Sequence, residues 1–170
     1  MVQTVSVVVP VYNEEDTLTH NSLILLGYLE DHLDEYEVVL VENGSVDNTA
    51  EYVAEIASGH PRVKAVSLPE PSLGGAIKAG IETACFDKVI YFPIDLSVNL
   101  SFISESIKLL DSNEIVIGSK RLWKTSDQRP LQRRLASSGY HKTVQFLFRT
   151  DLSDTTCVKA YQRHAVVESG

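Results

Sequence analysis

Two apolar runs that end in polar residues decide the fold: TVSVVVPVYNEE at residues 4–15 and EVVLVENGSVDNTAE at residues 37–51. Each run is rich in valine, stops at a polar turn and leads into a helix-like stretch. We therefore expect two strand–helix units whose polar turns lie at the carboxyl ends of neighbouring strands. Open α/β sheets bind their ligands at that edge, so the two turns are candidate parts of one site.

The same alternation continues along most of the chain. Near-continuous apolar runs predict strands buried on both faces, at Val5–Val11, Tyr36–Val41, Arg62–Ser67, Lys88–Phe92 and Ile115–Gly118. Helical patterns lie between them, at Glu15–Leu33, Asn48–Ala57, Gly75–Cys85 and Phe102–Leu110. Strands that alternate with helices indicate an α/β fold with a mostly parallel sheet and right-handed crossovers.

The pattern changes after Gly118. Lys120–Leu131 is polar and irregular and is expected to be a long loop, whereas Gln132–Phe148 reads as a helix. A short strand-like piece follows around Cys157–Tyr161. A chain of 170 residues can bury a sizeable core, so we expect a single domain over residues 1–170.

Three polar residues are expected to cap helices: Asn13, Asp47 and Ser101. Their short side chains can accept hydrogen bonds from the first free N–H groups of a helix. Glu14, Glu15 and Asp16 would then occupy the first turn of the first helix, where negative charge is favourable.

Charge is distributed unevenly along the chain. The net charge is −8, yet residues 1–61 hold 12 acids and no Lys or Arg, while residues 118–150 hold eight Lys or Arg and one acid. The basic segment predicts either an anionic partner or a solvated helix face. Nucleic-acid binding is disfavoured because the first third of the chain has no positive charge. No apolar stretch approaches the roughly 20 residues of a membrane-spanning helix, and two cysteines suit a reducing compartment.

Candidate binding groups gather at the predicted strand ends. Tyr12 offers a ring face and a hydroxyl, although a strand end with a helix cap is the better explanation of its turn in isolation. Glu42 and Asn43 can read the hydrogen-bonding edge of a base or a ribose. Gly74 and Gly75, with Lys78 one turn later, suit either a phosphate or close helix packing. The Walker and dinucleotide-binding glycine patterns are absent, which disfavours a nucleotidyltransferase or dinucleotide-binding enzyme.

An acid ends the fourth predicted strand in YFPIDLS, residues 91–97. Asp95 lies there between Ile94 and Leu96, and burying a carboxylate beside apolar residues is costly unless it faces a cleft or a cation. Mg²⁺ needs few protein ligands when it also binds substrate phosphates. Asp95 is therefore a candidate ligand of a divalent cation.

Six motifs, in order, resemble those of family 2 glycosyltransferases with the GT-A fold, most closely the polyprenyl (dolichyl) phosphate hexose synthases. They are VVVPVYNEE (7–15), VENGSVDNT (41–49), GGAIKAG (74–80), YFPIDLS (91–97), IVIGSKR (115–121) and DTTCVKAYQR (154–163). The resemblance implies a GT-A-type, Rossmann-like three-layer α/β/α sandwich. It also implies transfer of a hexose from a nucleotide-diphosphate sugar to a polyprenyl phosphate.

The resemblance also implies roles for individual residues. Asp95 would hold a Mg²⁺ or Mn²⁺ ion that bridges the donor's diphosphate, and Arg121 (or Lys120) and Arg134 would contact phosphates, which makes Asp95, Arg121 and Arg134 the expected catalytic residues. The donor's nucleotide would contact Pro10, Tyr12, Asn13, Glu14, Val41, Glu42, Asn43, Ser45, Lys78, Ile94 and Ser97.

The expected partners follow from the same resemblance. They are GDP-mannose or a UDP-hexose as donor and a polyprenyl phosphate as acceptor, handled by a cytoplasmic protein that is peripheral to the membrane. The chain departs from the family pattern at Pro93, where an acid is usual, at Glu42-Asn43, where two aspartates are usual, and at Val158, where the last motif usually has Gly-Phe. These departures, and an end at Gly170 that suggests truncation, leave open a binding member with impaired catalysis or a different acceptor.

Overall fold

The computed structural model describes residues 3–118 and 158–167. The chain divides into two compact units, residues 1–116 with 158–170, and residues 117–157. All the described residues except 117 and 118 belong to the first unit. The loop expected at 120–131 and the helix expected at 132–148 lie outside the described residues.

A six-stranded sheet forms the centre of this unit, in the order β3-β2-β1-β4-β6-β5. Its strands are β1 (Thr4–Val11), β2 (Glu35–Asn43), β3 (Val63–Leu68), β4 (Lys88–Tyr91), β5 (Ile115–Ile117) and β6 (Lys159–Gln162). The pairs of β1 with β2 and β4, and of β2 with β3, are parallel, whereas β6 runs antiparallel to β4. The prediction of a mostly parallel sheet is confirmed.

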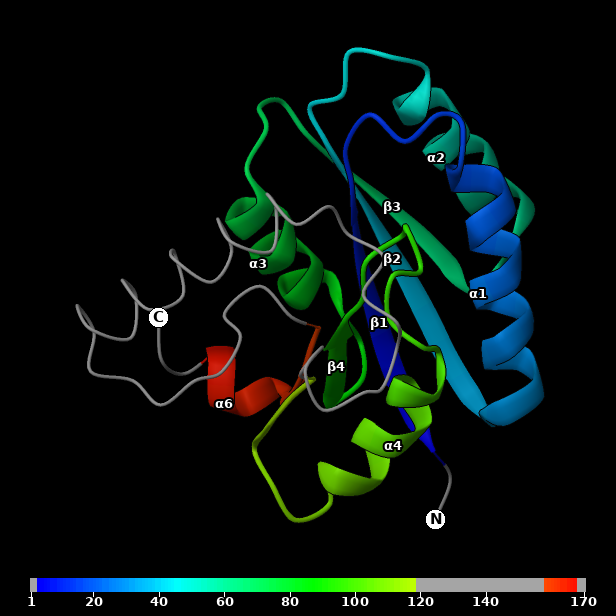
Figure 1. The fold of residues 1–170 in the computed structure, drawn as a ribbon. Helices are drawn as coiled ribbons and strands as arrows, with labels where there is room; N and C mark the ends of the chain where they lie inside the picture. Colours follow the sequence, from blue (N-terminus) through cyan, green and yellow to red (C-terminus); the bar gives the residue numbers. More distant parts are fainter. Residues whose placement is uncertain (1–2, 119–157, 168–170) are drawn as a thin grey trace, which may run out of the picture. The chain divides into compact units, whose positions relative to one another are not determined.

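Helices cover both faces of this sheet: α1 (Leu18–His32), α2 (Thr49–Gly59), α3 (Leu73–Thr83), α4 (Ser101–Leu109) and α6 (Arg163–Val167). Alternate β1 residues such as Val5, Val7 and Val9 join a buried cluster with α1, α2 and α4. Val8, on the opposite face of β1, packs in a second cluster with α3. Figure 1 shows α1 and α2 on the other side of the sheet from α3. The three-layer sandwich is thereby confirmed.

Two of the three predicted helix caps are wrong. Helix α1 begins at Leu18, not Glu15, and its N-cap position is Thr17, because the carbonyl of Glu14 accepts hydrogen bonds from the N–H groups of Thr17 and Leu18 in a preceding turn. Asn13 instead has a left-handed backbone, with φ of 52°. Consequently, the three acids expected in the first turn of α1 lie before the helix.

The other two N-cap positions each lie one residue from the predicted one. Leu100 occupies the N-cap position of α4, and the Asn99 side chain accepts from the N–H of Ser101 at 2.9 Å. Asn48 occupies the N-cap position of α2, although Asp47 does accept a hydrogen bond from the N–H of Thr49 at 3.0 Å. Asp47 therefore satisfies one free amide of α2, as expected of a capping residue.

The start of α3 also lies earlier than predicted. The helix begins at Leu73 instead of Gly75, because the Ser72 hydroxyl accepts a hydrogen bond from the N–H of Gly75 at 3.0 Å and occupies the N-cap position. Its end at Thr83 comes two residues before the predicted one at Cys85.

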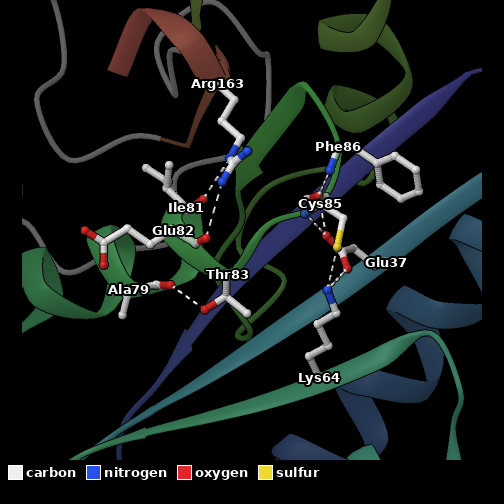
Figure 2. Close-up of polar contacts among 10 residues, drawn as sticks. Glu37, Lys64, Ala79, Ile81, Glu82, Thr83, Cys85, Phe86 and Arg163 are labelled. Carbon is white, nitrogen blue, oxygen red and sulfur yellow. Dashed lines mark hydrogen bonds and ion pairs between the residues drawn. The ribbon is translucent and has the colours of Figure 1, made fainter. Parts of the chain in front are cut away.

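A buried carboxylate connects the strands at the end of the sheet opposite the polar turns (Figure 2). Glu37 on β2 accepts hydrogen bonds from the Ser6 hydroxyl at 2.6 Å and the Cys85 N–H at 2.5 Å. The Lys64 ammonium on β3 lies 2.6 Å from its other oxygen and 2.8 Å from the Cys85 sulfur. Burial alone would raise the pKa of Glu37, but the bonds from Lys64, Ser6 and Cys85 outweigh it and lower that pKa.

An arginine fixes the carboxyl end of α3 near the same place (Figure 2). The Arg163 guanidinium donates to the carbonyls of Ile81 at 3.3 Å and Glu82 at 3.4 Å. A cation is favourable there because the last carbonyls of a helix carry partial negative charge. Arg163 thus joins the carboxyl-terminal part of the chain to the α3 layer.

Replacing a glycine with alanine should change the stability in opposite directions at two helical positions, Gly80 and Gly27. A Cβ at Gly80 on α3 would lie 2.1 Å from Val8 Cγ1, whereas a Cβ at Gly27 on α1 would meet nothing within 4 Å. We expect Gly80→Ala to lower the free energy of unfolding by about 1–3 kcal/mol through overpacking. Gly27→Ala should raise it by about 0.5–1 kcal/mol because alanine favours the helix. Urea denaturation measures both, and equal stabilities of the two variants would contradict this packing of α3 on β1.

Candidate functional site

The ends of β1 and β2 lie side by side, as predicted from their sequences. Pro10 pairs with Val41 and Val11 with Glu42 in the parallel register. Tyr12 follows directly, and its side chain is 44% exposed. An aromatic ring that remains this accessible at a strand end is available to a ligand.

Hydrogen bonds join the two polar turns into one structure. The Asn13 side-chain oxygen accepts from the N–H of Val46 at 2.9 Å, and the Ser45 hydroxyl accepts from the N–H of Asn13 at 3.1 Å. The Thr49 hydroxyl accepts from the N–H of Glu14 at 2.8 Å. The turn after β1 is therefore fixed to the turn after β2 by hydrogen bonds. The sequence predicts only that the two turns lie close together.

The acids of these turns bind neighbouring backbone and hydroxyl groups. Glu15 accepts from the N–H of Asn48 at 2.9 Å, and Asp47 accepts from the N–H of Glu15 at 3.4 Å. Hydrogen bonding by the Thr49 hydroxyl lowers the pKa of Asp47 further than desolvation raises it. The acidic side chains of these two turns thus stabilise the turns by accepting hydrogen bonds from their backbone.

Glu42 is buried, and its carboxylate also accepts hydrogen bonds from neighbouring groups. Its two oxygens accept from the Ser45 N–H and the Ser67 hydroxyl, both at 2.6 Å. Burial alone would raise the pKa of Glu42, but these hydrogen bonds outweigh it and lower the pKa. Ser67, on β3, has no motif around it that would have indicated this role in the sequence.

The turn after Glu42 is fixed against the loop before α3. The Asn43 side-chain oxygen accepts from the N–H of Ser72 at 2.7 Å. Gly44 has φ of +71°, and a Cβ there would lie 2.9 Å from the carbonyl carbon of Glu70. Only glycine fits this left-handed position without strain, so the Asn-Gly pair sets both the turn and its contact.

Asp95 lies at the same edge of the sheet, beyond β4. Tyr91 pairs with Val8 of β1, and the N–H of Phe92 donates to the Val8 carbonyl at 2.9 Å. Asp95 is exposed, and one of its oxygens accepts from the N–H of Ser97 at 2.9 Å. The neighbouring Ile94 carbonyl accepts from the Asn21 side chain at 3.0 Å, which ties this loop to α1.

The described residues fit a cation only through Asp95. Among residues 3–118 and 158–167, no three His, Cys, Asp or Glu side chains are grouped to hold a metal ion. The second oxygen of Asp95 accepts no hydrogen bond from a described residue. One carboxylate together with substrate phosphates and water suffices for Mg²⁺, so the site suits a cation that arrives with its ligand.

Three further residues predicted for the site are Lys78, Arg121 and Arg134, and the structure describes only Lys78. Lys78 is exposed on α3 and lies 4.0 Å from the Glu82 carboxylate. Its predicted contact with the nucleotide stays a prediction. Arg121 and Arg134 lie outside the described residues, as does the rest of the basic segment after position 118.

The family is decided by a match over residues 6–170 to the model described as Glycosyl transferase family 2. The chain belongs to glycosyl transferase family 2. This confirms the family that the six motifs indicate.

Two curated relatives are transferases by name, and the name of the second includes a lipid phosphate. Glycosyltransferase AglD of Haloferax volcanii is 31% identical over 95% of this chain and 27% of its own length. The undecaprenyl-phosphate 4-deoxy-4-formamido-L-arabinose transferase of Aeromonas hydrophila is 31% identical over 97% of this chain and 51% of its own length. The chain thus spans about a quarter and about half of these two curated relatives.

A solved structure shares the fold. Glucosyl-3-phosphoglycerate synthase from Mycobacterium tuberculosis, in complex with Mn²⁺, UDP-glucose and phosphoglyceric acid, superposes with a TM-score of 0.63 at 22% identity. The match covers 95% of this chain and 57% of that one. Within the described part of this chain, no helix is long and apolar enough to cross a membrane.

Proposed function

We propose that this family 2 glycosyltransferase moves a hexose from a nucleotide-diphosphate sugar to a polyprenyl phosphate. The observation that carries the proposal is the convergence of three strand ends, from β1, β2 and β4, at one edge of the sheet. This edge presents an exposed aromatic ring at Tyr12 and an exposed carboxylate at Asp95. The name of the Aeromonas relative supports a polyprenyl phosphate as the acceptor.

Tyr12 and the ends of β1 and β2 would bind the nucleoside of the donor. An aromatic ring can stack on a base of any sequence, because every base has a π-face. Pro10 lies in β1, and the turns that carry Asn13 and Ser45 are joined by hydrogen bonds before any ligand binds. A preorganised loop loses less conformational freedom on binding, which favours affinity.

Asp95 would hold the divalent cation, Mg²⁺ or Mn²⁺, with Ser97 nearby. The similar synthase structure contains both Mn²⁺ and UDP-glucose, which supports a divalent cation that binds together with the donor. When bound, such a cation neutralises the charge that develops as the nucleotide diphosphate leaves. The Ser97 N–H donates to one carboxylate oxygen of Asp95 and so fixes that side of the carboxylate.

A lipid phosphate acceptor is already an oxyanion nucleophile, so this reaction needs no strong general base. Arg121 and Arg134 would contact the phosphates, since a guanidinium binds phosphate oxygens bidentately. The eight Lys or Arg in residues 118–150 would bring the protein to an anionic membrane surface. We place it at the cytoplasmic face, as a peripheral protein.

Pro93 favours a second candidate, a nucleotide-sugar-binding member whose catalysis is impaired. Pro93 stands where the family motif usually has an acid, and a lone carboxylate at Asp95 gives a cation fewer protein ligands. This candidate binds nucleotide without turnover. Pro93→Asp would then raise the rate of transfer, whereas in an active enzyme it would raise cation affinity alone.

Nucleotide binding tests both candidates. We expect GDP-mannose, UDP-glucose or UDP-GlcNAc, with Mn²⁺, to raise the melting temperature by several degrees, because a ligand that binds only the folded state stabilises it by about 2.7 kcal/mol at 100 times its dissociation constant. The shift should shrink without the cation. A thermal-shift screen measures it, and no shift with any nucleotide sugar would contradict the proposal.

A further inference from the structure

We propose that the polar turn at the end of β2 reads the donor's base through a hydrogen-bond donor, the Asn43 side-chain N–H₂, and not through a carboxylate. The inference rests on the proposed function and specifies how its nucleotide site selects a base. The base must then present an acceptor atom, a carbonyl oxygen or an unprotonated ring nitrogen, towards Asn43.

The carboxylate beside Asn43 is already fully engaged inside the protein. Glu42 is 3% exposed, and its oxygens accept from Ser45 N–H and the Ser67 hydroxyl at 2.6 Å. Moving this carboxylate to a ligand would leave two donors unsatisfied, which costs free energy at each buried group. Glu42 therefore shapes the turn and is not presented to the base.

The orientation of the Asn43 amide is fixed by its contact. Its oxygen accepts from the Ser72 backbone N–H at 2.7 Å, and a backbone N–H can only donate. The two ends of the amide are therefore assigned by chemistry. Its nitrogen, Nδ2, is the end that remains for a ligand.

That nitrogen has no hydrogen-bond partner among the described residues, although Asn43 is only 5% exposed. Ser22 Oγ is the one fully enclosed side-chain nitrogen or oxygen without a partner in the described part of the chain, so Nδ2 is not an enclosed atom that lacks a partner. A nearly buried amide group normally finds a partner in protein, water or ligand. Asn43 and the exposed Tyr12 directly follow the paired residues Glu42 and Val11, an arrangement that suits a base stacked on the Tyr12 ring.

The acids nearby are engaged in the same way as Glu42. Asp47 and Glu15 both accept from loop N–H groups. The acidic region at the strand ends thus directs its carboxylates towards backbone amides, and the free polar atom beside β2 is a donor. The sequence, with Glu42 and Asn43 in place of two aspartates, cannot show which of the two side chains is free.

Asn43→Asp tests the inference with a nearly isosteric change. The aspartate can still accept from Ser72 N–H, but it replaces the free donor by a second acceptor. We expect the affinity of the preferred nucleoside diphosphate, measured by isothermal titration calorimetry with UDP, GDP and CDP in Mn²⁺, to fall by about tenfold or more. The matched control is Asn113→Asp, which adds the same charge at an exposed residue whose side chain contacts only the Leu109 carbonyl; it should bind like the wild type.

The outcomes separate this inference from the proposed function. If the wild type binds none of the nucleotides, the proposed function fails. If the wild type binds and Asn43→Asp binds equally well or more tightly, the base is read by an acceptor and the inference is overturned.

A measurement on the wild type tests the inference even if the Asn43→Asp variant does not fold. In ¹⁵N-labelled protein, the assigned Asn43 side-chain N–H₂ protons should shift downfield as the nucleotide is titrated. Unchanged Asn43 signals at saturation would also overturn the inference.

Discussion

Replacing Asp95 with asparagine should lower kcat/KM for sugar transfer by at least about 100-fold, because a group that stabilises the charge of the leaving diphosphate is worth at least that much in rate. Asparagine keeps an oxygen that can accept from the Ser97 N–H, so the turn after β4 should persist. The cation-dependent part of the thermal shift should disappear in the variant, while its melting temperature without ligand should stay close to that of the wild type.

Asp87→Asn is the matched control for this prediction. Asp87 is also an exposed aspartate, but it lies before β4, at the opposite end of that strand. Its backbone carbonyl accepts from the Arg163 N–H, a contact that the substitution leaves in place. An Asp95→Asn enzyme as active as the Asp87→Asn enzyme would exclude Asp95 as the cation ligand.

The largest loss of stability should come from Glu37. Three groups donate to its buried carboxylate: the Lys64 ammonium, the Ser6 hydroxyl and the Cys85 N–H. In Glu37→Gln the side chain turns an N–H₂ group towards at least one of these donors and leaves it unpaired. Leaving a buried hydrogen-bonding group unpaired costs about 1–3 kcal/mol, and more for a charged group, so we expect urea denaturation to show a loss of about 3 kcal/mol.

An exposed ion pair provides the comparison. Glu82 and Lys78 lie 4.0 Å apart on α3, and both side chains are more than half exposed. Glu82→Gln makes the same chemical change there and should cost less than about 0.5 kcal/mol. Equal effects of the two substitutions would show that the network around Glu37 is not a stabilising feature.

The contribution of Glu37 should also depend on pH. Its folded-state pKa is lowered, below the value of about 4.3 for an unfolded glutamate. The stabilisation is therefore fully present above the unfolded pKa and is lost as the pH falls through the folded pKa. The stability difference between wild type and Glu37→Gln, measured from about pH 6 to about pH 3, should shrink at the acid end. A difference that grows on acidification would contradict the network.

The strands were predictable because each is a short apolar run with its own boundaries. The predicted strands Val5–Val11 and Tyr36–Val41 differ from β1 and β2 by at most two residues at either end. Helix starts were less predictable, because they depend on contacts distant in sequence. Asn13 has a left-handed backbone, and its side chain accepts a hydrogen bond from Val46 in the turn after β2. No pattern near Asn13 in the sequence indicates this distant partner.

The candidate site was predicted in position but not in detail. The sequence identified Tyr12, Glu42 and Asp95 as strand-end residues, and the structure brings their strands to one edge. It could not predict that Ser67, 25 residues away, would engage the Glu42 carboxylate. For the same reason the free donor of Asn43 and the Glu37–Lys64 pair across two strands became visible only in three dimensions.

The central claim is tested most directly by following the lipid product. Purified protein is incubated with a polyprenyl phosphate, Mn²⁺ and GDP-mannose or UDP-glucose, and the lipid fraction is analysed by mass spectrometry. We predict a polyprenyl phosphate that has gained one hexose, with its formation dependent on the cation and on Asp95. Binding of the nucleotide sugar without any glycosylated lipid from either donor would contradict the claim.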